Sequence, residues 1–103
     1  MSVMLYIEIT TSEEKIEDGK PFGWRKKESI FVRNSITGEE RERLNDVLDA
    51  NGIWPLYDSE ADEFNANVTR DQLNGYLTDA KLMDYVPDLP QWDGYRDVAI
   101  TLN

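Results

Sequence analysis

The sequence predicts a two-layer α+β domain, in which two helices pack on one face of a mostly antiparallel sheet of four or five strands. Three observations predict this fold class. Apolar and polar residues alternate near both ends of the chain, two segments with helical periodicity begin with capping motifs, and turn residues separate the early strands. Because 103 residues suffice for one domain, residues 1–103 are expected to form a single compact acidic domain.

The first and last predicted strands have the clearest alternation, which is typical of a strand with one buried face. In residues 2–10 the apolar positions are Val3, Leu5, Ile7 and Ile9. In residues 95–102 they are Val98, Ile100 and Leu102. Because the last predicted strand is this apolar, it is expected to lie inside the sheet.

A hairpin with a long loop is predicted between these ends. Residues 11–20 are polar and contain the turn signal Asp18-Gly19, and residues 29–33 alternate again as a return strand. The basic run at residues 25–27 follows Trp24, a combination that could suit nucleic acid. Because the chain as a whole is strongly acidic, we expect this run to pair with acidic residues or to face solvent.

The first predicted helix lies between a capping box at Thr37-Gly38-Glu39-Glu40 and a stop at Asn51-Gly52. One of its faces is apolar and contains Leu44, Val47 and Leu48. Another face is acidic and contains Glu39, Glu42, Asp46 and Asp49. Successive acidic residues are three or four positions apart in the sequence, so they are separated by about 5 Å along the helix axis.

Residues 53–57 then predict a buried strand, which Pro55 places at a sheet edge or at a bulge. Residues 63–68 predict a second strand that pairs with it across an acidic tip. The carboxylates of this tip are Asp58, Glu60, Asp62 and Glu63. The spacing of the first three resembles the start of an EF-hand loop, but the sixth position lacks the required glycine, so no calcium site is expected.

The second predicted helix begins at another capping box, Thr69-Arg70-Asp71-Gln72, and runs to about residues 80–84. Its apolar stripe contains Leu73, Tyr76, Leu77 and Ala80. Gly75 weakens a helix, which predicts that another element packs closely against it.

Residues 86–94 contain two prolines and the turn Asp93-Gly94, so they predict a loop that carries Trp92.

Composition excludes several chemistries. The chain has no cysteine and no histidine, which removes disulfides, thiolate metal sites and the usual nucleophile–histidine pairs. A carboxylate-only glycosidase or metal-dependent nuclease stays open, but no pattern marks a buried carboxylate pair and no glycine-rich phosphate loop is present. We therefore expect a protein that is not an enzyme and that has no catalytic residue, cofactor or metal ion.

The net charge of −10 lies entirely in residues 37–103, which hold five basic and fifteen acidic residues, whereas residues 1–36 hold six of each. Such a field attracts basic surfaces and repels nucleic acid and anionic membranes. The sequence has no signal-peptide pattern and no membrane-spanning run. We therefore expect a cytoplasmic protein that contacts neither nucleic acid nor a membrane directly.

Two functions fit these properties. The first is an inhibitor or binding protein that occupies the basic nucleic-acid-binding surface of a partner, such as a nuclease, as phage anti-restriction and anti-CRISPR proteins and bacterial immunity proteins do. Its predicted contact residues are Glu39, Glu42, Asp46, Asp49, Asp58, Glu60, Asp62 and Glu63, with Trp54 or Trp92 as an aromatic anchor. The second is a structural or assembly subunit, monomeric or homodimeric, which is acidic for solubility and associates through an apolar patch or the edge strand at residues 53–57.

Overall fold

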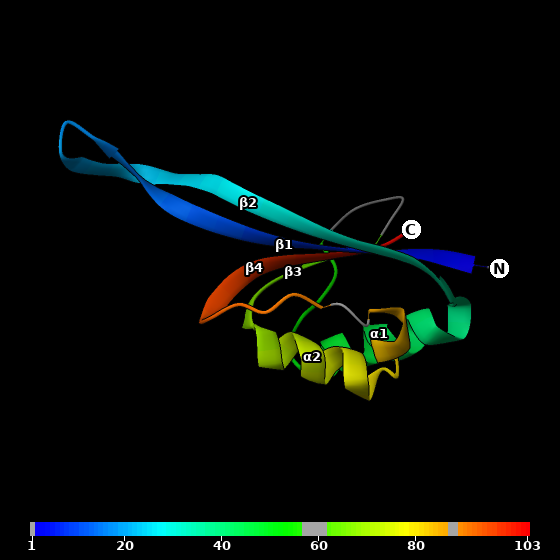
Figure 1. Ribbon diagram of the computed structural model, residues 1–103. Helices are drawn as coiled ribbons and strands as arrows, with labels where there is room; N and C mark the ends of the chain where they lie inside the picture. Colours follow the sequence, from blue (N-terminus) through cyan, green and yellow to red (C-terminus); the bar gives the residue numbers. More distant parts are fainter. Residues whose placement is uncertain (1, 57–61, 87–88) are drawn as a thin grey trace.

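The computed structural model describes residues 2–56, 62–86 and 89–103, and it shows a two-layer molecule with principal extents of 53 × 30 × 23 Å (Figure 1). Four strands form one sheet in the order β2-β1-β4-β3, and each neighbouring pair is antiparallel. Both α-helices lie on the same face of this sheet (Figure 1). The predicted α+β fold class is therefore confirmed.

The elements follow one another along the chain with few connecting residues. They are β1 (Ser2–Glu17), β2 (Lys20–Thr37), α1 (Gly38–Ala50), β3 (Asp62–Thr69), α2 (Arg70–Asp79), the 3₁₀ helix η1 (Met83–Tyr85) and β4 (Tyr95–Leu102). The last strand, β4, lies between β1 and β3, which confirms the prediction that this apolar terminal strand is inside the sheet.

The β1–β2 hairpin is much longer than predicted. The expected loop at residues 11–20 is wrong, because β1 continues to Glu17 and only Asp18 and Gly19 form the turn. Their φ angles of 53° and 73° are those of a two-residue type I′ turn. Since β4 pairs with β1 only from Leu5 to Thr10, residues 11–28 project beyond the sheet as a two-stranded arm (Figure 1).

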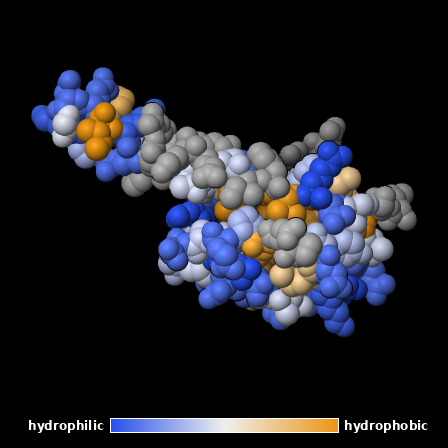
Figure 2. All heavy atoms as spheres, viewed as in Figure 1, coloured by the Kyte–Doolittle hydropathy of each residue, from blue (hydrophilic) through white to orange (hydrophobic). Residues whose placement is uncertain are grey.

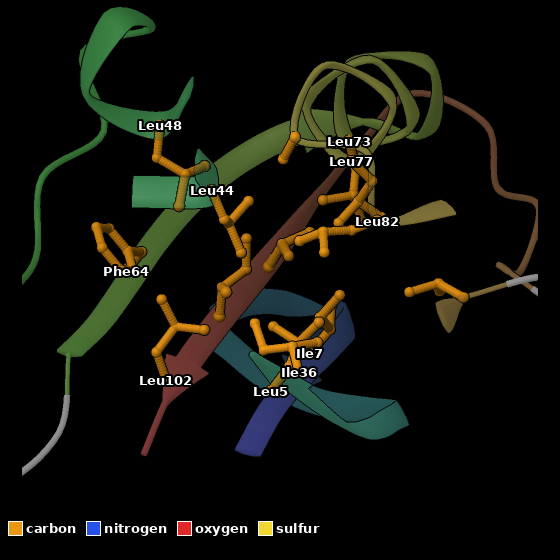
Figure 3. Packing of buried hydrophobic residues seen from close by; sticks show 14 of the residues in the cluster. Leu5, Ile7, Ile36, Leu44, Leu48, Phe64, Leu73, Leu77, Leu82 and Leu102 are labelled. Carbon is orange, nitrogen blue, oxygen red and sulfur yellow. The ribbon is translucent and has the colours of Figure 1, made fainter. Parts of the chain in front are cut away.

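The hydrophobic core lies between the sheet and the helices. Figure 3 shows Leu44 and Leu48 of α1, together with Leu73 and Leu77 of α2, pointing toward the side chains of the strands. All four leucines are buried, as predicted from the helical periodicity. The strand residues that meet them include Leu5, Ile7, Phe64, Ile100 and Leu102.

Both helices begin directly at the last residue of a strand. The Thr37 hydroxyl accepts a hydrogen bond of 3.1 Å from the N–H of Glu40, whose carboxylate accepts one of 2.8 Å from the N–H of Thr37. Thr69 and Gln72 repeat this reciprocal arrangement at α2. Both predicted capping boxes are confirmed, and each satisfies two backbone donors that a helix start leaves unpaired.

The predicted stop of α1 is also confirmed. Gly52, with φ of 75°, donates 3.0 Å to the carbonyl of Asp49, and Ile53 donates 2.9 Å to the carbonyl of Leu48. These two bonds form a Schellman motif, in which a residue with positive φ follows the helix. The C-terminal end of α1 is therefore fixed as firmly as its start.

The segment after α1 differs from its prediction. Residues 53–56 form no strand, Trp54 and Leu56 are 66% and 49% exposed, and Tyr57 is outside the described residues. Between the described residues of this segment and β3, the expected pairing is represented by one bond of 2.7 Å, from Leu56 N–H to Glu63 O. Instead, β3 pairs along its whole length with β4.

Three further sequence predictions have different outcomes. The expected close packing at Gly75 is wrong, because no heavy atom lies within 4 Å of the position that a β-carbon would take. The expected loop at residues 86–94 is confirmed in the residues that the structure describes there, whereas α2 ends at Asp79, before the expected residues 80–84, and is followed by the single turn η1. None of the helices in the described residues is long and apolar enough to cross a bilayer.

Candidate partner-binding surface

The candidate surface is the outer side of α1. Burial of Leu44 and Leu48 fixes the rotation of this helix against the sheet. At 3.6 residues per turn, the side chains of the four predicted acidic residues then leave the helix within an arc of about 80°. We call this set, which consists of Glu39, Glu42, Asp46 and Asp49, the acidic face of α1. All four are exposed, and in the view of Figure 2 mainly hydrophilic residues cover the helical layer.

Most of these carboxylates have no strong partner in the protein. No hydrogen bond or ion pair joins Glu42 or Asp46 to another residue of the described part of the chain. The Glu39 side chain is 85% exposed, and its carboxylate lies 3.9 Å from the Arg43 guanidinium. An exposed pair at this distance contributes little, so the negative charge of the face stays available to a partner.

The neighbouring arginines make their shortest contacts with groups outside the acidic face. Arg41 forms an ion pair of 2.5 Å with Asp62 of β3, and Arg43 donates 3.1 Å to the carbonyl of Ala80. Arg70 reaches the carbonyl of Leu89 at 3.5 Å. In the described part of the helical layer, Lys81 is the one fully exposed cation, and it follows the C-terminal end of α2.

Of the other predicted acidic residues, Asp62 and Glu63 lie on β3 and not on α1. Asp62 is half-buried in its pair with Arg41, and Glu63 is half-buried on β3. Asp58 and Glu60 lie outside the described residues. The structure therefore brings together the four acidic residues of α1, while Asp62 pairs with Arg41 and lines the same pocket as Glu42.

The two candidate aromatic anchors occupy different environments. Trp54 is exposed, and its indole N–H donates a hydrogen bond of 2.6 Å to the carboxylate of Asp49, so it lies against one end of the acidic face. Trp92 is half-buried against the core, and its indole nitrogen is buried without a hydrogen-bond partner in the described residues. Trp54 is thus the candidate that a partner can reach.

Glu40 is an acidic residue of α1 with a different role. Its carboxylate accepts from the backbone N–H of Thr37, which is the main reason that its pKa is lowered. The Tyr85 hydroxyl donates to the same carboxylate and lowers this pKa further. Glu40 therefore stabilises the start of α1 and is not counted in the acidic face.

Sequence reasoning missed the arm and its apolar end. Ile16 and Phe22 are 71% and 67% exposed near the turn, where Figure 2 shows hydrophobic atoms. The arm, residues 11–28, holds five basic and five acidic residues, so the net charge of −10 belongs to the rest of the molecule. The dipeptide Asp18-Gly19 predicted a turn within a loop; as one of the strongest hairpin signals in a sequence, it could also have indicated strands that reach the turn itself.

The described part of the chain contains no group of three acidic, histidine or cysteine side chains that could hold a metal ion. Comparisons with protein-family models, with curated proteins and with solved structures give no significant match to this chain. Its function must therefore be inferred from the geometry and charge of its own surface.

Proposed function

We propose that this protein is a small acidic binding protein, which uses the acidic face of α1 to occupy a basic nucleic-acid-binding surface of another protein. The observation that carries this proposal is the group of four exposed carboxylates on one side of α1, with the nearby arginines engaged elsewhere. A helix that is fixed at both ends holds the backbone of these residues in one arrangement, so a partner has only their side chains left to order.

Electrostatics gives a reason for the partner class. Phosphates along one DNA strand are about 3.4 Å apart on the helix axis, and carboxylates along α1 are about 5 Å apart. The carboxylates of α1 therefore resemble DNA phosphates in their electrostatic field and not in the positions of their atoms. Such a field speeds association with a positively charged surface and competes with nucleic acid for it. Proteins that inhibit restriction enzymes, CRISPR effectors or nuclease toxins use the same physical principle.

The arm favours a second candidate function, an assembly subunit. Exposed apolar side chains at the end of a neutral two-stranded arm, such as Ile16 and Phe22, are typical of a contact with another protein. In this alternative the acidic charge serves solubility alone. The two functions predict that partner binding is sensitive to different substitutions, because one function depends on α1 and the other on the arm.

Matched charge variants distinguish these functions. In the first variant, Glu39→Gln, Glu42→Gln and Asp46→Asn neutralise the face and leave Asp49 in contact with Trp54. In the control, Glu14→Gln, Glu17→Gln and Asp18→Asn neutralise three exposed residues of the arm. Both changes alter the net charge from −10 to −7, so they differ in location and not in total charge.

The variants and the unaltered protein are immobilised and exposed to nuclease-treated bacterial lysate at several salt concentrations. We expect the α1 variant to lose capture of basic nucleic-acid-binding proteins by more than about tenfold, mainly through slower association, and the arm control to retain it. A captured protein should also bind duplex DNA or this chain, but not both together. Equal capture by both variants, or simultaneous binding of DNA, would contradict the proposal.

A further inference from the structure

The outer edge of β3 carries unpaired backbone groups. β3 pairs with β4 on one side only, and it is the last strand of the sheet. The carbonyl of Glu63 accepts from Leu56, which lies outside the sheet, so the backbone groups of Glu63 point away from β4. Because strand residues alternate in this respect, the N–H and C=O groups of Asn65 and Asn67 also point outward.

Beyond the charged residues Asp62 and Glu63 at its start, the sequence of β3 lacks the features that usually protect such an edge. Natural edge strands contain lysine, proline or a bulge that prevents another strand from pairing with them. The other edge strand, β2, contains Pro21, several basic residues and register shifts against β1. β3 contains neither lysine nor proline, and its pairing with β4 has no register shift from Asp62 to Thr69.

A groove of about 460 Å³ follows this edge. One wall is the backbone of β3 at residues 65–68, and the other is formed by residues that include Ile53, Trp54 and Tyr76. An extended peptide in this groove could form main-chain hydrogen bonds to Asn65 and Asn67 and place alternate side chains against the aromatic wall.

Trp54 is held in position beside the groove. The hydrogen bond of 2.6 Å from its indole N–H to Asp49 orients the ring, although the residue is 66% exposed. An exposed tryptophan that is already oriented loses little conformational freedom when a ligand covers it. The free edge and the oriented aromatic ring are independent features, and they meet in one groove.

The charge around the groove selects the occupant. Its lining contains no charged side chain, while the carboxylate of Asp49 accepts a hydrogen bond from the lining residue Trp54. A second copy of this chain would bring its own net charge of −10 to the same place, whereas a basic segment would be attracted. The geometry points to an extended, lysine- or arginine-rich polypeptide segment that adds to β3 as a fifth strand. This inference goes beyond the proposed function, because it does not require contact with the acidic face of α1.

Amide hydrogen exchange tests strand addition directly. The probe is a synthetic peptide of alternating lysine and valine that matches the eight residues of β3, and the control peptide alternates glutamate and valine. With the lysine peptide, we expect exchange at Asn65 and Asn67 to slow by at least about tenfold. The amides of Phe64, Ala66 and Val68 point toward β4 and provide an internal reference.

Two substitutions of Asn65 distinguish the contribution of its backbone N–H to peptide binding from that of its side chain. Asn65→Pro removes the outward N–H and leaves the ladder to β4 intact, whereas Asn65→Ala removes only an exposed side chain. Binding of the lysine peptide should weaken at least about tenfold in the proline variant relative to the alanine variant. If the proline variant does not fold, exchange in the unaltered protein still decides the question.

Four results would overturn the inference. The first is unchanged exchange at Asn65 and Asn67 with saturating lysine peptide, and the second is equal protection by the glutamate peptide. The third is protection that grows with protein concentration in the absence of peptide. The fourth is equal binding of the lysine peptide by the folded proline and alanine variants. The α1 charge variant provides the link to the proposed function. Edge protection that persists in this variant, together with unaltered capture of basic proteins, would reject the role of α1 and keep the role of β3.

Discussion

The Tyr85 hydroxyl donates a hydrogen bond of 2.9 Å to Oε1 of Glu40, the same oxygen that accepts the backbone N–H of Thr37 at 2.8 Å. A residue of η1 thereby contacts the capping box of α1. The bond favours the ionised form of Glu40 and the protonated form of Tyr85, so the pKa of Glu40 is lowered and that of Tyr85 is raised. The N-terminal end of α1 is thus coupled to the segment that follows α2.

This coupling predicts a specific acid sensitivity. Because the pKa of Glu40 is lowered in the folded state, its contribution to stability is present above the ordinary value of 4.5 and is lost as the pH falls through the lowered value. Glu40→Gln keeps an acceptor for Thr37, as Gln72 does for Thr69, but cannot titrate. We expect the thermal midpoint of the wild type to fall more than that of the variant between pH 7 and pH 3, mostly below pH 4.5. Parallel curves for the two proteins would rule out this role.

Gly75→Ala should stabilise the protein. The glycine is inside α2, its φ is not positive, and a β-carbon there would meet no heavy atom within 4 Å. Alanine is more favourable than glycine in a helix by about 1 kcal/mol, so urea denaturation should show a gain of about that size. Gly52→Ala is the opposite control, because φ of 75° disfavours a β-carbon and should cost about 1–2 kcal/mol. A loss of stability in Gly75→Ala would indicate a contact that the structure does not show.

Leu44→Ala should destabilise the protein by about 2–5 kcal/mol, because the side chain is completely buried among residues of both layers. Leu56→Ala makes the same chemical change at a position that is 49% exposed, and it should cost less than about 1 kcal/mol. Both values come from urea denaturation. Similar costs at the two positions would contradict the rotation of α1 that exposes its acidic face.

The arm should be dispensable for folding. None of its described side chains is buried, and Thr11 and Glu28 are directly paired at its base. Replacing residues 12–27 by Asn-Gly would close the hairpin there with a two-residue turn. We expect the free energy of unfolding to change by no more than about 1 kcal/mol. A protein without the arm that no longer folds would show that the arm contributes to the core.

Local sequence signals predicted the helices well, because the determinants of a helix are close together in the chain. Thr37 and Thr69 mark the two starts, Gly52 marks a stop, and the periodicity of the leucines gives the buried faces. The same periodicity placed the four carboxylates of α1 on one exposed face. Alternation likewise identified β4 and the first part of β1, where one face of each strand is buried.

The errors have a common physical origin in contacts between distant residues. The arm shows no sustained alternation, and none of its described side chains is buried, so its strands resembled a loop. Residues 53–56 have apolar side chains but form no strand, and β3 pairs with β4, which lies 26 to 40 positions further along the chain. The bond between Trp54 and Asp49 likewise depends on how the chain leaves α1, which periodicity does not describe.

Thr37 and Thr69 each end a strand and cap a helix, so no linker separates strand from helix at either junction. The strand consequently sets the angular phase of the helix that follows it. One residue inserted after Thr37 would turn every later side chain of α1 by about 100°. The buried leucines and the exposed carboxylates would rotate together. The direction in which the acidic face points therefore cannot change unless the packing of the core changes with it.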